Sequence, residues 1–152
     1  YLSELKQRLG QLEGDPGRGR HIFHSRKVAC IGCHRMDDQG GQVGPDLSKI
    51  SQIRSPDDLL ESVVFPSSSI ALGYRGYTIA TDDGQVHTGL IVRETSEAIF
   101  LRTAQLAEIR VPRSHVETMQ DAHLSVMPQG LEKTMNEQEL SDLLAFLAER
   151  RE

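Results

Sequence analysis

Two cysteines and a histidine are the residues of this sequence whose types and spacing could do chemistry together. Cys30 and Cys33 are the only cysteines among 152 residues, two residues lie between them, and His34 follows directly. Thiols and imidazoles are nucleophiles and metal ligands. The string is therefore compatible with a short-loop disulfide, half of a zinc site, a thiol redox pair or an attachment point for haem. The rest of the chain has to decide among these four possibilities.

Haem attachment is the interpretation that uses all three side chains. A zinc site needs four ligands, and the sequence has neither a second cysteine pair nor paired histidines at finger spacing. A thioredoxin-like pair is expected after a strand in a βαβ unit, whereas helical patterns surround this motif. In a haem site the two thiols add to the vinyl groups of one porphyrin edge, and the imidazole of His34 reaches the iron from the same side. A bare thiol pair or a disulfide stays open as the simpler alternative.

The motif is expected at the end of a helix. Asp15 followed by Pro16 has the pattern of an N-cap and a first helical residue, and this helix runs through Phe23 toward the cysteines. Before it, leucines at heptad spacing predict a short amphipathic linker helix over residues 1–14, ending near Gly14. These leucines are Leu2, Leu5, Leu9 and Leu12.

Two further helices follow from start signals in the sequence. Ser55-Pro56 opens a helix that stops at Phe65-Pro66, and Asn136-x-x-Glu139 is a capping-box start for a helix near the end of the chain. The apolar residues of the last helix recur at helical spacing, which indicates a face that packs on a core. They are Leu140, Leu143, Leu144 and Leu147.

From about Tyr74 to about Met119 the sequence pattern changes from one typical of helices to one typical of strands. This stretch is rich in Thr, Val and Ile, with Asp83-Gly84 as a hairpin signal and residues 95–97 as a second turn. Four or five short strands at this spacing predict a small antiparallel sheet or barrel. We therefore expect a discontinuous helical domain, residues 15–73 and 120–152, with an inserted β subdomain at residues 74–119.

Composition limits the function classes. The net charge of −5 argues against a general nucleic-acid binder. No apolar stretch approaches the length of a membrane span, and no signal segment opens the chain. Because the chain begins at Tyr1, we expect an excised piece with any export signal upstream. Apolar residues make up only 38%, aromatic residues 5%, and tryptophan is absent, so a bound group is expected to complete the core.

The residues around the motif resemble a class I c-type cytochrome. "GGQVGPDL" places Gly44-Pro45-x-Leu47 after the histidine, and Met127-Pro128 precedes the last helix. By this resemblance Cys30 and Cys33 form the haem thioethers, and His34 is an axial ligand whose Nδ1 proton is accepted by the carbonyl of Pro45. Gly44 and Leu47 belong to the same haem-binding loop. Met127 would be the sixth ligand. Its competitors in the sequence are Met119, Met135 and His123.

A closer resemblance, over residues 15–150, is to the planctomycete-type haem-binding domain family. It rests on the haem motifs together with the stretches "DDGQVHTGLIVRETSEAIFLRTAQ" and "VPRSHVETM". This resemblance implies a mainly α cytochrome c fold, α+β overall, with a small antiparallel β insertion before the methionine loop. It also implies one covalent haem c, export to a periplasmic or other extracytoplasmic compartment, and electron transfer with an upstream dehydrogenase-like domain or a partner protein.

The expected function is that of an electron carrier and not of an enzyme. Iron with two protein ligands leaves no open position for a substrate, and no nucleophile-base constellation occurs elsewhere. The alternative is a haem-based sensor or peroxidase-like domain in which Met127 is labile or never bound. A haem-free adhesion module built on the β insertion is a third possibility. The segment Arg18–Arg35 has five cations and no acid, which predicts a positive docking surface beside the haem.

Overall fold

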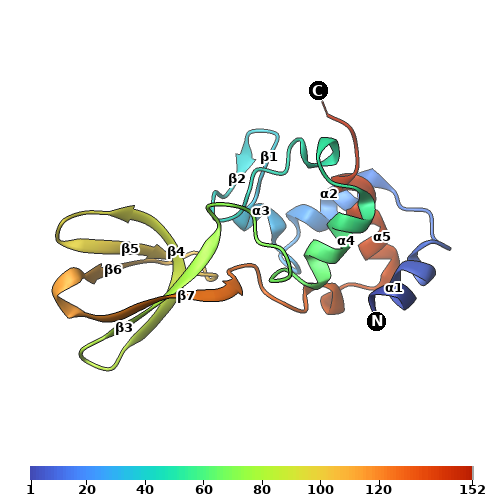
Figure 1. Ribbon diagram of the computed structural model, residues 1–152. Coiled ribbons are helices and arrows are strands. Elements are labelled where there is room, and N and C mark those ends of the chain that lie inside the picture. Colours follow the sequence, from blue (N-terminus) through green and yellow to red (C-terminus); the bar gives the residue numbers. More distant parts are fainter. Residues whose placement is uncertain (152) are drawn as a thin grey trace. The chain divides into compact units, whose positions relative to one another are not determined.

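The computed structural model describes residues 1–151, which form two compact units (Figure 1). A helical unit contains residues 1–68 and returns from Gln129 onward, and a sheet unit contains Ser69–Pro128. The helices are α1 (Leu2–Leu9), α2 (Pro16–His24), α3 (Cys30–Cys33), α4 (Pro56–Val64) and α5 (Glu137–Leu147). Single 3₁₀ turns are η1 (Ile50–Gln52), η2 (Arg113–His115) and η3 (Leu131–Thr134). Among the described residues no helix is long and apolar enough to cross a bilayer.

Three helices begin where their capping residues predict. The Asp15 carboxylate accepts from the Arg18 amide at 2.7 Å at the start of α2. Ser55 and Asn136 each form a capping box, with Asp58 and Glu139 respectively. These bonds satisfy amides that have no partner inside the helix, which explains why local sequence defines these starts.

The first helix is shorter than the leucine spacing predicts. α1 ends at Leu9, and the amides of Gln11 and Leu12 close tight turns on the carbonyls of Arg8 and Leu9. Gly10, the C-cap, has poor helix propensity and ends a helix that is already too short to be stable alone. The expectation that the helix extends close to Gly14 was therefore wrong.

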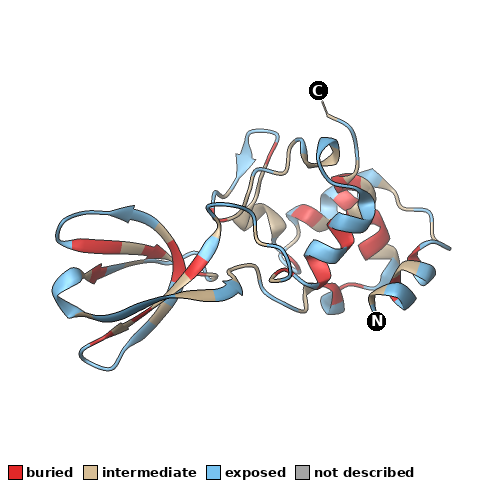
Figure 2. Ribbon diagram, viewed as in Figure 1, coloured by how far each residue is buried: buried red, intermediate tan, exposed pale blue. Residues whose placement is uncertain are grey.

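Helices α2 and α5 pack closely because a glycine lies at their contact. A Cβ atom added to Gly19 would lie 1.9 Å from the carbonyl oxygen of Asp142 and 2.7 Å from Cβ of Phe146. The rings of Phe23 and Phe146 meet beside it with centroids 5.5 Å apart. The residues buried in the helical unit cluster where α2, α4 and α5 face one another (Figure 2). The glycine thus lets two backbones approach to a distance that a side chain would forbid.

Asp142 ties the start of α2 to α5. Its carboxylate accepts two bonds from the Arg18 guanidinium, at 2.8 and 2.9 Å, and one from the Asp15 amide at 2.8 Å. The hydrogen bonds from Arg18 are the main reason that the pKa of Asp142 falls to about 2. Asp142 is 3% exposed, so these bonds satisfy a buried carboxylate that would otherwise be costly.

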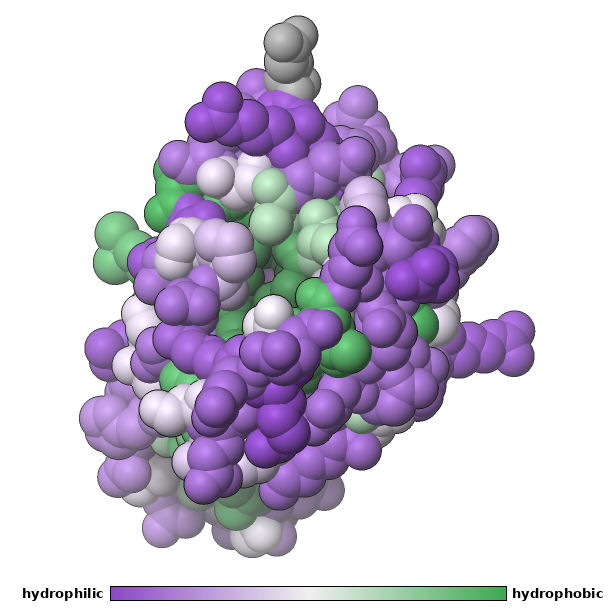
Figure 3. All heavy atoms as spheres, turned by 90° about the vertical axis from the view of Figure 1, so that its right-hand side faces the viewer, coloured by the Kyte–Doolittle hydropathy of each residue, from purple (hydrophilic) through white to green (hydrophobic). Residues whose placement is uncertain are grey.

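Polar side chains cover most of one outer face of the helical unit, and apolar atoms show in a depression between them (Figure 3). The short hairpin of β1 (Arg35–Met36) and β2 (Gln39–Gly40) belongs to the same unit. Its two turn residues, Asp37 and Asp38, both have positive φ, at 50° and 67°. This is the geometry of a two-residue hairpin turn, in which aspartate is tolerated.

The sheet unit is a five-stranded antiparallel sheet in the order β6-β5-β4-β3-β7, counted over residues 1–151. The strands are β3 (Arg75–Thr81), β4 (Val86–Glu94), β5 (Ala98–Arg102), β6 (Glu108–Pro112) and β7 (Val116–Ser125). Both predicted turns are present, between β3 and β4 and between β4 and β5. Four buried residues form its core: Ile79, Ile99, Leu101 and Val111.

The last strand continues past the predicted end near Met119. β7 pairs with β3 from Thr81↔Val116 as far as Arg75↔Ser125, with bulges on the way. Because β3 supplies partners over its whole length, pairing carries β7 to Ser125. The compact sheet unit, Ser69–Pro128, is accordingly wider than the range 74–119. The chain is α+β, with the helical part and the antiparallel sheet as separate units.

Candidate haem-attachment site

The two cysteines lie on the single helical turn α3. Ala29 precedes the turn in the left-handed conformation with φ 50°, and the His34 amide closes it on the Cys30 carbonyl at 2.9 Å. Residues three apart on a helix lie on the same face. Both thiols are free and partly accessible. The turn therefore presents two unbridged sulfurs on one side, with the histidine immediately beyond them.

Burial raises the pKa of both thiols, that of Cys30 to about 11. A reactive redox pair instead has a lowered thiol pKa, from neighbouring cations or a helix N-terminus. Among the described residues no group of three or more His, Cys, Asp or Glu side chains could hold a metal ion. The raised pKa values of Cys30 and Cys33 are thus opposite in direction to those of a thioredoxin-like pair.

His34 is held in one tautomer by a backbone carbonyl. Its Nδ1 lies 2.7 Å from the oxygen of Pro45. A carbonyl can only accept, so Nδ1 carries the proton and the lone pair is on Nε2. Burial lowers the pKa of His34, and the bond to Pro45 opposes this in part. A neutral imidazole with a free Nε2 is the form that binds iron or another metal.

Gly44 lies directly against the imidazole ring of His34. A Cβ atom at this position would lie 2.5 Å from Cε1 and 2.8 Å from Nδ1 of His34. The Gly44 amide donates to the Cys33 carbonyl at 2.8 Å, and the Leu47 amide donates to Arg35 at 2.9 Å. The backbone of residues 44–47 is thus hydrogen-bonded to the end of the Cys-x-x-Cys-His motif. Gly44 leaves room there for the His34 ring.

Two further glycines of this loop have a role that the sequence interpretation missed. A Cβ atom at Gly41 would lie 2.0 Å from the Gly32 carbonyl oxygen, and Gly40 has φ +109° beside the carbonyl of His34. The Gly41 amide also donates to Ile31 at 2.9 Å. The paired glycines in "GGQVG" were the available signal, because adjacent glycines mark a close backbone approach.

Replacing Gly44 by alanine is expected to displace the imidazole and lengthen its bond to Pro45. The added methyl has no free volume beside the ring, so we expect a loss of about 1–3 kcal/mol in the free energy of unfolding, typical of overpacking. Urea unfolding followed by circular dichroism measures this loss, and the NMR signal of the His34 Nδ1 proton reports the bond. Gly10→Ala is the control, since its Cβ would meet nothing closer than 3.3 Å. Equal stability for the two variants would contradict the role assigned to Gly44.

The structure brings together six of the seven predicted haem-binding residues. Cys30, Cys33, His34, Gly44, Pro45 and Leu47 all lie in the helical unit, whereas Met127 belongs to the sheet unit, just before the chain re-enters the helices at Gln129. The Met127 amide donates to Ser125 Oγ at 3.1 Å.

The competing distal ligands lie in other settings. Met119 lies inside β7 and is 43% exposed, and Met135 is 8% exposed at the start of α5. The His123 side chain is largely exposed, with Nδ1 3.7 Å from the Asp121 carboxylate.

Several cations of the segment Arg18–Arg35 are paired with acidic side chains. Arg18 pairs with Asp142, Lys27 with Glu139 at 2.7 Å, and Arg35 with Asp38 at 3.1 Å. Within residues 1–151 Arg20 and Arg26 form no ion pair. Acids that follow the segment in sequence thus pair with three of its five cations, and the docking role of the segment stays a prediction.

Free thiols one turn apart and an oriented imidazole fit a covalently attached haem. The cytochrome c family model matches residues 17–89, a stretch that contains α2 apart from its first residue, the motif, its glycine loop and α4. This match supports a c-type cytochrome domain that binds haem and transfers electrons. It ends within β4, before Met127 and α5. No curated protein matches the chain.

Proposed function

We propose that this chain is an electron-transfer domain of the planctomycete-type haem-binding family, carrying one haem c. The observation that carries the proposal is the arrangement of two free thiols on α3 and His34 with its Nδ1 proton on Pro45. Haem, when bound, supplies the one-electron couple. Cys30 and Cys33 hold it through thioether bonds, and His34 binds the iron through Nε2.

Met127 is the distal ligand in this proposal. A thioether opposite imidazole is a soft pairing that favours ferrous iron and raises the potential relative to two imidazoles. With both axial positions filled by protein, no position is left for a substrate, so the domain relays electrons and is not an enzyme. The support for Met127 is its place in the Met-Pro dipeptide before the last helix.

The partner in this proposal is an upstream dehydrogenase-like domain or a separate redox protein in an extracytoplasmic compartment. Arg20 and Arg26 are exposed. Exposed charges raise the rate at which two proteins meet more than they raise the affinity of the complex. Two exposed arginines therefore favour a partner with an acidic surface.

Absorption spectroscopy tests the proposed function. Haem that stays with the protein through acid-acetone extraction, and a low-spin spectrum in both oxidation states, are the expected results. A colourless protein would exclude the haem assignment altogether. A high-spin ferric spectrum would instead favour the sensor or peroxidase-like alternative, since it requires an open or weakly bound position.

Replacing Met127 by histidine is expected to keep the haem low-spin and to lower its potential. A second imidazole stabilises ferric iron, and the decrease should be on the order of 0.1–0.3 V, a fraction of the roughly 0.8 V that axial ligands span. Potentiometric titration followed by absorbance measures the change. Met119→His is the matched control. Because Met119 lies in strand β7, this substitution is expected to leave the potential unchanged. If the Met119 variant shifts and the Met127 variant does not, the ligand assignment fails.

A further inference from the structure

The loop that carries the Pro45 carbonyl is joined by a side chain to the hairpin that follows His34. The Asp37 amide, in the turn between β1 and β2, donates to Ser48 Oγ at 2.8 Å. Three residues before Ser48, the Pro45 carbonyl accepts the Nδ1 proton of His34 at 2.7 Å. The stretches 34–37 and 45–48 are thus bonded at both ends, and the Pro45 carbonyl faces the imidazole only while the loop keeps this position.

The Ser48 hydroxyl is itself fixed by the carboxylate of Asp46. It donates to Oδ1 of Asp46 at 2.6 Å, and the Ser48 amide donates to the same oxygen at 2.9 Å. A hydroxyl has one proton and two lone pairs, so donating to Asp46 leaves a lone pair for the Asp37 amide. A charged acceptor also polarises the hydroxyl, which strengthens the bond that it accepts. A side chain without a hydroxyl cannot make this connection.

The hairpin turn is anchored on α5 from its other side. Nε of Arg151 lies 3.3 Å from the Asp37 carboxylate, and the Arg151 side chain is only 13% exposed. Its guanidinium lies over the Phe146 ring, 4.5 Å from the centroid, and donates to the Phe146 carbonyl at 3.0 Å. Asp37 is therefore held between Arg151 and Ser48, through its carboxylate on one side and its amide on the other.

We propose that Ser48 is a positioning residue for His34: it holds the Pro45 carbonyl against the imidazole, and Arg151 anchors the turn to which Ser48 is bonded. The inference rests on the proposed function in one respect, that Nε2 of His34 binds the iron. A firm hydrogen bond from Nδ1 makes the imidazole a more basic ligand, which favours ferric iron. Ser48 thus lowers the reduction potential through His34.

Ser48→Ala in the haem-loaded domain tests this proposal. We expect the potential to rise, because a weaker bond to Pro45 leaves His34 a poorer electron donor. The Nδ1 proton of His34 should exchange with solvent about tenfold faster, as for the loss of one net hydrogen bond. Potentiometric titration and NMR of the reduced protein measure the two effects. Ser48→Thr keeps the hydroxyl and should restore both values.

Ser62→Ala is the matched control for Ser48→Ala. The Ser62 hydroxyl donates to the Asp58 carbonyl within α4 at 2.8 Å, so its removal should change neither the potential nor the exchange rate.

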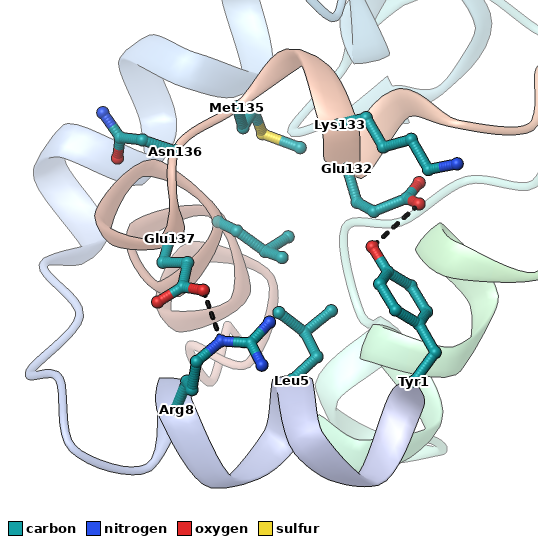
Figure 4. Close-up of a pocket in the computed structure, with 9 residues that line it drawn as sticks. Tyr1, Leu5, Arg8, Glu132, Lys133, Met135, Asn136 and Glu137 are labelled. Carbon is teal, nitrogen blue, oxygen red and sulfur yellow. Dashed lines mark hydrogen bonds and ion pairs between the residues drawn. The ribbon is translucent and has the colours of Figure 1, made fainter.

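Arg151→Gln is a second variant, which leaves the loop itself untouched. It removes the ion pair with Asp37 and should shift both measurements in the same direction as Ser48→Ala, but by less. Its matched control is Arg8→Gln, which also breaks an ion pair to α5. The Arg8 guanidinium donates to Glu137 at 2.6 Å (Figure 4). Because this pair ties α1, and not the hairpin turn, to α5, both measurements should keep their wild-type values.

Two failures can be told apart in these experiments. Wild-type potential and exchange rate in a haem-loaded Ser48→Ala variant would overturn the positioning role, as would equal changes in Ser62→Ala. A wild-type protein that holds no haem would instead contradict the proposed function. The exchange rate of the Nδ1 proton in the haem-free chain would then still decide the positioning role, because the bond from His34 to Pro45 needs no iron.

Discussion

Unfolding at a much lower urea concentration is the expected result of replacing Gly19 by valine. The Cβ atom of any side chain at this position would lie 1.9 Å from the backbone oxygen of Asp142, and backbone cannot move aside as a flexible side chain can. Helices α2 and α5 would have to separate, which loosens the contact between Phe23 and Phe146. We expect a loss of about 3 kcal/mol in the free energy of unfolding, at the upper end of overpacking.

The matched control for Gly19 is Gly17→Ala on the same helix. Gly17 is exposed, and its Cβ would meet only the Asp15 carboxylate, at 3.1 Å. Alanine improves helix propensity by about 1 kcal/mol, so the net change should be small. Urea denaturation of both variants, followed by circular dichroism, gives the comparison. Matching midpoints would show that α2 and α5 do not meet at Gly19.

Loss of the covalent cofactor and of most of the fold is the expected result of changing both Cys30 and Cys33 to serine. Serine matches cysteine closely in size, and both positions are partly accessible, so the change itself disturbs packing little. A hydroxyl does not form the thioether. A tightly held ligand stabilises the native state by about 4 kcal/mol at a thousand times its dissociation constant. A chain with 5% aromatic residues has little other core material to replace this contribution.

Thermal unfolding and acid-acetone extraction of this double variant measure the two effects. The wild type should keep its haem in the protein fraction, and the variant should release it and lose its cooperative transition. The single variants are the controls, since each retains one thioether and should hold the haem with intermediate stability. A colourless double variant that still unfolds cooperatively at the wild-type temperature would show that the helical core is complete without haem.

Sequence alone determined the features that depend on neighbours within about four residues. Asp15, Ser55 and Asn136 cap helices through bonds to amides three positions ahead, so their side chains define the starts wherever the helix packs. The hairpin at Asp83-Gly84 is likewise local, with Gly84 at φ +84°. The spacing of Cys30, Cys33 and His34 also follows from one turn of chain, which is why the attachment chemistry could be predicted before any fold.

Tertiary structure alone decided which distant groups meet. The acids that neutralise Arg18 and Lys27 lie more than 100 positions away in the sequence, so an acid-free segment looked like a charged surface. The length of β7 depends on how much of β3 remains to pair with it. The need for glycine at position 44 depends on the ring of His34 lying against it. Such contacts form because folding buries apolar surface and pairs the polar groups buried with it, and no local pattern encodes their partners.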